Sequence, residues 1–122
     1  MKNIVIIGGT KGIGKAIVSE VVDNNNVVCL SRNQTDFSHD NYTFHSFDAL
    51  VDDYPDFDSV DCLIYCPGSI NLKPISTLSL DDFRNDFELN VIGAVRAIKK
   101  YLNLLKKSGS ASILLFSTVA TK

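Results

Sequence analysis

Residues 3–17 read Asn-Ile-Val-Ile-Ile-Gly-Gly-Thr-Lys-Gly-Ile-Gly-Lys-Ala-Ile, and this stretch decides the fold. The β-branched run before Gly8 is typical of a buried strand, and the residues after Gly12 bring apolar side chains to one helical face. Glycines at positions 8, 12 and 14 permit a tight turn and let a phosphate approach the backbone without a Cβ in the way. The amides of the first helical turn would face that anion, which the helix dipole favours. The stretch therefore predicts a strand, a glycine-rich turn and a helix that bind a diphosphate.

Two other interpretations of this turn remain open. Glycines at such a spacing also occur in turns that only cap a helix and bind nothing. Gly9 to Lys15 fits the Gly-x4-Gly-Lys pattern of a nucleoside triphosphatase loop, but Ala16 stands where that loop needs a Ser or Thr for Mg²⁺. The strand before the turn and the helix after it favour dinucleotide binding over both alternatives.

Apolar runs alternate with turn signals along the rest of the chain. Strands are expected near residues 3–8, 27–31, 42–47, 61–66 and 112–117, and helices near 12–24, 49–54 and 80–107. This alternation predicts right-handed crossovers and an α/β fold with a doubly wound, Rossmann-type parallel sheet in the strand order 3-2-1-4-5. The sequence has no repeat, low-complexity tract or linker, so residues 1–122 are expected to form one nucleotide-binding domain.

Composition excludes several classes of function. The net charge of −2 argues against a nucleic-acid surface, and the apolar run after Lys2 ends at Gly8, too early for a signal peptide or a membrane span. Cys29, Cys62 and Cys66 fall in expected strands and are interpreted as small buried hydrophobic residues of a reducing, cytoplasmic compartment. The carboxylates between residues 48 and 61 are interpreted as a solvated face, so no metal site is expected.

The Gly-x3-Gly-x-Gly spacing of residues 8–14 resembles the short-chain dehydrogenase/reductase family. Asp48-Ala49 resembles the family's acidic position that contacts adenine after the third strand, and Tyr65-Cys66-Pro67-Gly68 stands in place of its Asn-Asn-Ala-Gly. Asn90-Val91-Ile92-Gly93 matches its Asn-Val-x-Gly, and residues 113–118 resemble the strand that carries its active-site hydroxyl. The resemblance implies hydride transfer between a nicotinamide cofactor and a small carbonyl or secondary alcohol substrate.

The resemblance also implies which residues bind the cofactor. They are Gly8, Thr10, Lys11, Gly12, Ile13 and Gly14 of the turn, Ser31 and Arg32 after the second strand, and Asp48, Cys66, Pro67, Gly68 and Asn90. For Asp48, a role in capping the segment that follows it is equally open. For the dipeptide Pro67-Gly68, an ordinary loop turn is the alternative.

The choice between cofactors is argued from charge at the end of the second strand. An acid there accepts hydrogen bonds from the adenosine ribose and repels a 2′-phosphate, but this chain has Leu30-Ser31-Arg32-Asn33. The Arg32 guanidinium and the Ser31 hydroxyl suit a phosphate, and Lys11 adds a second positive charge. Basic residues at these two places accompany NADP(H) in the resembled family, so NADP(H) is expected over NAD(H). The alternative is that both cations are solvated surface residues.

Three residues are candidates for the chemistry. Asn90 lies among apolar residues of the expected helix and is therefore predicted to be a buried amide. By the resemblance, Asn90 holds a water molecule in the proton relay, and a structural role is the alternative. The hydroxyl that polarises the substrate maps onto Thr118 rather than Ser117, and a strand-end hydroxyl without chemistry is the alternative.

The family's Tyr-x3-Lys pair is expected roughly a dozen residues beyond Thr118, and this sequence does not contain it. We therefore interpret the chain as the nucleotide-binding part of a longer enzyme, or as a truncated product that lacks the C-terminal strands and helices of the family fold. Little or no turnover is expected from it alone. A non-catalytic dinucleotide-binding module, such as a redox sensor or an assembly subunit, is the alternative.

Segment 80–107 has the clearest helical pattern, and Ser79 with Asp82 can cap its start. Tyr101 and Leu104 add apolar surface beyond one stripe, which allows a second packing surface. Members of the resembled family often dimerise through this helix, so a homo-oligomer and an ordinary sheet-covering helix are equally open. The apolar run at 112–117 is typical of a strand buried on both faces, and without cover it would favour association.

Overall fold

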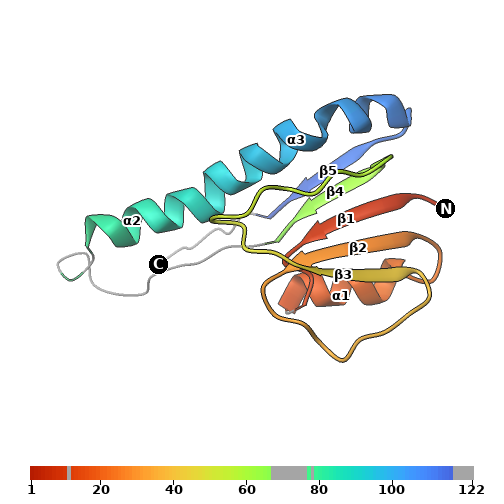
Figure 1. Ribbon diagram of the computed structural model, residues 1–122, viewed down its shortest axis with the longest axis horizontal. Helices are drawn as coiled ribbons and strands as arrows, with labels where there is room; N and C mark the ends of the chain where they lie inside the picture. The colour runs from red at the N-terminus through yellow and green to blue at the C-terminus, as the bar shows by residue number, and fades with distance from the viewer. Residues whose placement is uncertain (11, 67–76, 78, 117–122) are drawn as a thin grey trace, which may run out of the picture.

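The computed structural model describes residues 1–10, 12–66, 77 and 79–116. Five parallel strands form one sheet in the order β3-β2-β1-β4-β5 (Figure 1). The strands are β1 (Asn3–Ile7), β2 (Asn26–Ser31), β3 (Tyr42–Ser46), β4 (Cys62–Tyr65) and β5 (Ser112–Leu115). The helices are α1 (Gly12–Val21), α2 (Leu80–Phe87), the π-helical segment η2 (Glu88–Ile92) and α3 (Gly93–Ser108). The predicted α/β class and strand order are confirmed.

Helices cover the sheet from both sides, and each side has its own core. On one face Val18 of α1 and Val22, just after this helix, pack against Ile4, Ile6, Val27 and Ile64. On the other face Ala94, Ala97, Tyr101 and Leu105 of α3 pack against Val5, Ile7, Leu30, Leu63 and Tyr65. The alternation of side chains along β1 and β4 explains this division, because successive residues of a strand point to opposite faces.

The helix expected at 49–54 is wrong. A single turn forms there, in which the amides of Val51 and Asp52 donate to the Asp48 carbonyl at 3.2 and 2.9 Å. Pro55 restricts the residue before it to extended backbone, so the turn does not continue as a helix. The segment runs instead along α3, where the Tyr101 hydroxyl donates to the Pro55 carbonyl at 2.7 Å.

The expected helix at 80–107 forms, with one irregularity. Ser79 and Asp82 make a reciprocal capping box at its start, and Gly109, with φ of 77°, follows its end. The π-helical turn η2 interrupts it, and α2 extends beyond the sheet without a buried residue (Figure 1). Tyr101 is fully buried in the core, so it does not contribute to a second packing surface as predicted.

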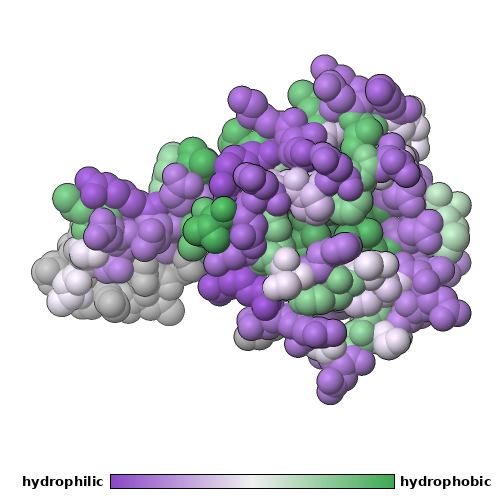
Figure 2. All heavy atoms as spheres, viewed as in Figure 1, coloured by the Kyte–Doolittle hydropathy of each residue, from purple (hydrophilic) through white to green (hydrophobic). Residues whose placement is uncertain are grey.

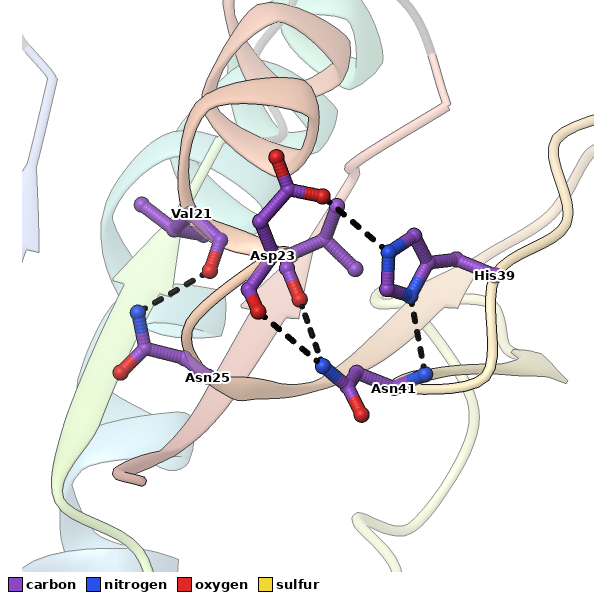
Figure 3. A network of polar contacts seen from close by, with 6 residues as sticks. Val21, Asp23, Asn25, His39 and Asn41 are labelled. Carbon is purple, nitrogen blue, oxygen red and sulfur yellow. Dashed lines mark hydrogen bonds and ion pairs between the residues drawn. The ribbon is translucent and has the colours of Figure 1, made fainter.

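The connection between β2 and β3 contains no helix in the described chain and is fastened by polar contacts (Figure 3). His39 Nε2 contacts a carboxylate oxygen of Asp23 at 3.1 Å, and the Asn41 side-chain amide donates to the Val22 carbonyl at 3.0 Å. These contacts tie the start of β3 to the end of α1. They therefore fix β3 beside β2, whose last residues reach the candidate site.

Candidate functional site

The glycine turn after β1 has the backbone conformation that its sequence predicts. Gly8 and Gly12 have φ angles of 82° and 55°, in the left-handed region that favours glycine, and α1 begins at Gly12. The Gly8 amide donates to the Leu30 carbonyl at 2.7 Å, which closes the turn against β2.

The third glycine of the motif serves close packing. A Cβ on Gly14 would overlap the carbonyl oxygen of Gly8 and would lie 2.9 Å from the Cα of Gly9. Since both neighbours are backbone atoms, neither can move aside cheaply, and the first turn of α1 is held directly on the glycine turn. A phosphate at the amides of this helix end would therefore meet a fixed backbone.

A cavity of about 270 Å³ opens beside the turn, where the carboxyl ends of β1, β2, β3 and β4 meet. This is the place where open parallel sheets bind ligands. The structure brings together at its wall six of the predicted cofactor residues: Gly8, Thr10, Ser31, Arg32, Asp48 and Cys66. These residues come from four separate parts of the sequence, and the sheet order makes them neighbours.

Two hydroxyls join the glycine turn to the end of β2. Thr10 Oγ1 lies 3.0 Å from Ser31 Oγ, and the Thr10 side chain is buried. The next residue, Arg32, is exposed and lines the same cavity. The ribose end of a dinucleotide would thus meet a hydroxyl pair and a cation at the end of β2, with no carboxylate on β2 itself.

Asp48 makes polar contacts with the single turn that follows it. Its carboxylate oxygen Oδ1 accepts from the Leu50 amide at 2.9 Å, and its own amide donates to the Asp52 carboxylate at 2.7 Å. Asp48 also lines the cavity. The side-chain contact of a cap therefore forms, but it closes a single turn and not the predicted helix, and contact with adenine stays a prediction.

Cys66 follows β4 and contributes a neutral wall. Its amide donates to the Ile7 carbonyl at 2.8 Å, which holds it against β1. Burial, with a smaller contribution from the nearby Cys29 thiol, raises the pKa of the Cys66 thiol to about 11. The thiol thus stays protonated near neutral pH and adds no charge to the cavity.

A family model described as short chain dehydrogenase matches residues 34–122. The chain belongs to the short-chain dehydrogenase family. No curated protein sequence gives a significant match. The matched part includes the end of the cavity formed after β3 and β4, together with all of α2, η2 and α3.

Solved structures of this family share the fold. A short-chain dehydrogenase from Leptospira borgpetersenii with bound NAD⁺ has a TM-score of 0.82 and 20% identity, over 96% of this chain and 51% of that one. A family protein from Francisella tularensis has a TM-score of 0.78 and 27% identity, over 93% of this chain and 49% of that one. ElxO with bound NADP has a TM-score of 0.75 and 24% identity, over 93% and 54%. The chain thus spans about half the length of these three proteins.

Other predicted site residues lie away from the cavity wall. Gly12 and Ile13 are exposed at the first turn of α1. The prediction that Asn90 is buried is wrong: it is exposed in η2, because this part of the helix reaches the end of the sheet. Lys11, Pro67, Gly68, Ser117 and Thr118 lie outside the described residues.

Sequence reasoning missed part of the cavity wall, namely Phe47, Ala49, Leu50 and Leu89. Their positions carried a signal, since each lies within two residues of Asp48 or Asn90, to which the family motifs point. Within the described part of the chain, no three His, Cys, Asp or Glu side chains are grouped as metal ligands. Nor is any helix there long and apolar enough to cross a membrane.

Proposed function

We propose that this chain is the NADP(H)-binding domain of a short-chain oxidoreductase, formed by residues 1–122 and working in the cytoplasm. The cofactor would exchange a hydride between its nicotinamide and a small carbonyl or secondary alcohol substrate. The cavity beside the glycine turn supports this function, because it lies at the carboxyl ends of the parallel strands and is lined by Gly8 and Thr10.

The end of β2 is the observation that carries the choice of NADP(H). Arg32 and Ser31 line the cavity, and the Ser31 hydroxyl lies 3.0 Å from that of Thr10, another residue of its wall. A guanidinium and hydroxyls are strong partners for the 2′-phosphate, whereas the ribose of NAD(H) is bound best by a carboxylate at this position. Matched structures hold NAD⁺ in one case and NADP in another, so this local charge has to decide.

Each candidate residue has a distinct task in this proposal. The turn residues Gly8, Thr10, Lys11, Gly12, Ile13 and Gly14 would hold the diphosphate, and Asp48, Cys66, Pro67 and Gly68 would line the adenosine and ribose path. Thr118, or its neighbour Ser117, would donate a hydrogen bond to the substrate oxygen. Asn90 would hold a water molecule that passes a proton.

A titration of the folded chain with NADPH and NADH, followed by nucleotide fluorescence, tests the proposal. We expect NADPH to bind at least about tenfold more tightly, a difference of about 1.4 kcal/mol. Arg32→Ala should bring the two affinities together by weakening NADPH alone. Arg84→Ala is the matched control, because Arg84 is exposed on α2 beside Asp81 and away from the cavity. Equal affinities in the unmodified chain, or a preference for NADH, would overturn the assignment.

The second candidate is a dinucleotide-binding module without chemistry, and a Tyr-x3-Lys pair beyond Lys122 would argue against it. These 122 residues contain no Tyr-x3-Lys pair to protonate the product oxygen. We therefore expect the chain to bind NADPH without oxidising it at an appreciable rate when simple carbonyl compounds are added. Steady carbonyl-dependent loss of NADPH absorbance would reject the non-catalytic module.

We further propose that the chain forms a homo-oligomer, a dimer or tetramer, through the helical segment 80–107. Val91, Val95 and Leu102 are apolar and partly exposed along η2 and α3, and their spacing places them on one side of the helix. Figure 2 shows apolar side chains along this helix between polar ones. Such a row provides a surface for a second copy.

A further inference from the structure

The π-helical turn η2 leaves one backbone carbonyl in an unusual position. The Gly93 amide donates to the Glu88 carbonyl, five residues back, instead of to Leu89, four residues back as in an α-helix. The Leu89 carbonyl is bonded by another part of the chain: the Tyr65 hydroxyl donates to it at 2.5 Å. The side chain of Leu89 lines the candidate cofactor cavity.

Tyr65 is well suited to this contact. It stands at the end of β4 with only 4% of its surface exposed, so its ring cannot easily move away. Burial raises the pKa of its hydroxyl to about 12, and the group therefore remains a hydrogen-bond donor at neutral pH. In the resembled motif an asparagine occupies this place, so the contact belongs to this chain's own sequence.

Gly93 shows that the hydroxyl and the helix are fitted to each other. A Cβ at Gly93 would overlap the Tyr65 hydroxyl oxygen and would lie 3.2 Å from the ring carbon Cζ. The Gly93 carbonyl in turn accepts from the Tyr54 hydroxyl at 3.3 Å. Two tyrosines from different segments thus donate to the carbonyls of Leu89 and Gly93. Gly93 has a helical φ of −58°, so it is the Tyr65 side chain and not the backbone conformation that requires a glycine there.

A second part of the cavity wall is tied to the same helix. The Arg96 guanidinium on α3 donates to the Ala49 carbonyl, and both Ala49 and Leu89 line the cavity. The helix therefore carries one wall residue itself and holds a second through its backbone. A change in the helical turn at η2 would move Leu89 while leaving Ala49 tied to α3.

We propose that Tyr65 is a positioning residue for dinucleotide binding, and that its hydroxyl holds the π-helical turn so that Leu89 stays in the cavity wall. The inference rests on the proposed function, because its ligand is the dinucleotide. Without the hydroxyl, the Gly93 amide is free to return to the Leu89 carbonyl. If the turn closed to α-helical geometry, the residues before it would rotate about the helix axis by about 100°, the angle of one residue. Leu89 would then leave the wall, and Asn90 would change direction with it.

Two hydroxyl deletions in the complete 122-residue chain test this role. Tyr65→Phe should weaken NADPH binding about tenfold, as expected when one well-formed hydrogen bond that positions the site is lost. Tyr101→Phe is the matched control, because Tyr101 is also buried and its hydroxyl donates to a backbone carbonyl, that of Pro55, at 2.7 Å. Both variants should lose similar stability, but the control should bind NADPH within twofold of the unmodified chain.

A double-substitution cycle gives a second readout that does not depend on the nucleotide. Gly93→Ala should destabilise the chain strongly, because of the overlap with the Tyr65 hydroxyl. In a Tyr65→Phe background the same substitution should cost clearly less, since the overlapping atom is gone. Additive losses in urea unfolding would mean that the two positions are not fitted to each other, which would overturn the inference.

The outcomes separate the two proposals. If the unmodified chain binds neither NADPH nor NADH, the proposed function fails and the positioning role fails with it. If the unmodified chain binds NADPH and Tyr65→Phe binds it equally well, only the positioning role is overturned. Equal weakening by Tyr65→Phe and Tyr101→Phe would also overturn it, because general loss of stability would then explain both.

Discussion

Strands β1 and β5 have similar sequences and opposite surroundings. Asn-Ile-Val-Ile-Ile and Ser-Ile-Leu-Leu are both apolar after their first residue, and both belong to the same parallel sheet. Ile6 of β1 has no exposed surface, whereas 43% of Leu114 in β5 is exposed. Apolar sequence alone therefore does not decide burial in this molecule.

The elements around each strand explain the difference. β1 pairs with β2 and β4, and its side chains meet the α1 side on one face and the α3 side on the other. β5 pairs with β4 at one edge, and in the described ranges nothing pairs with its other edge. The cavity lies beside β1, whose two faces are both covered. β1 thus supplies a rigid backbone of the kind that a phosphate site needs, whereas β5 contributes exposed apolar surface.

The largest effect should come from truncating a side chain at matched places in the two strands. Ile6→Ala should lower the free energy of unfolding by about 3 kcal/mol, because it leaves a cavity in a closed core. Leu114→Ala should cost about 1 kcal/mol or less, since its side chain already contacts solvent. Urea unfolding followed by circular dichroism measures both.

The two losses of stability test whether β5 is uncovered in solution. A loss for Leu114→Ala as large as that for Ile6→Ala would mean that β5 is covered in solution, for example by a second copy. Repeating the measurement at tenfold lower chain concentration distinguishes that case, because cover by another copy weakens on dilution.

The fold was predictable because its signals are local. β-branched runs and a helical period define the elements, and right-handed parallel crossovers leave few strand orders to choose from. The failure at 49–54 has a local cause, since Asp48 closes one turn with its side chain and Pro55 stops the next. The burial of β5 was not predictable, because it depends on what lies beside the strand and not on the strand.

The candidate site also has residues that the sequence could predict and residues that it could not. Gly8, Ser31 and Arg32 were predictable because the end of a parallel strand fixes where a residue lies. The places of Leu89 and Asn90 were not, because one extra residue in a helical turn changes the direction of every side chain before it. That extra residue is accommodated by Tyr65, which is 24 positions away in the sequence. The apolar pattern of the helix itself therefore does not indicate the extra residue.

A smaller effect of pH on stability should come from Cys66, which follows β4, the strand between β1 and β5. Burial raises the pKa of the Cys66 thiol from 9.0 to about 11, so the folded chain holds this proton more tightly than the unfolded chain does. The corresponding stability is complete below pH 9 and is lost as the pH rises from 9 toward 11. We expect about 1 to 2 kcal/mol from this group.

Comparison with Cys66→Ala isolates that contribution. Urea unfolding at pH 7, 9 and 10.5 should show the difference between the two chains shrinking as the pH rises, because the variant has no thiol to ionise. Other buried groups, such as Tyr65, ionise in both chains and cancel in the difference. A difference that stays constant up to pH 10.5 would mean that the Cys66 thiol contacts solvent, as the side chains of β5 do.

The smallest effect on stability should accompany a change in association. Val95 is 45% exposed on α3, and Val95→Lys should change the free energy of unfolding by about 0.5 kcal/mol or less. If the exposed row on this helix contacts a second copy, the buried charge should weaken self-association in sedimentation velocity by at least about tenfold. Asn103→Lys is the control, since it adds the same charge at an exposed polar position of the same helix. Association unchanged by Val95→Lys but abolished by Leu115→Lys would move the contact from the helix to β5, and the uncovered strand would then be the surface that joins two copies.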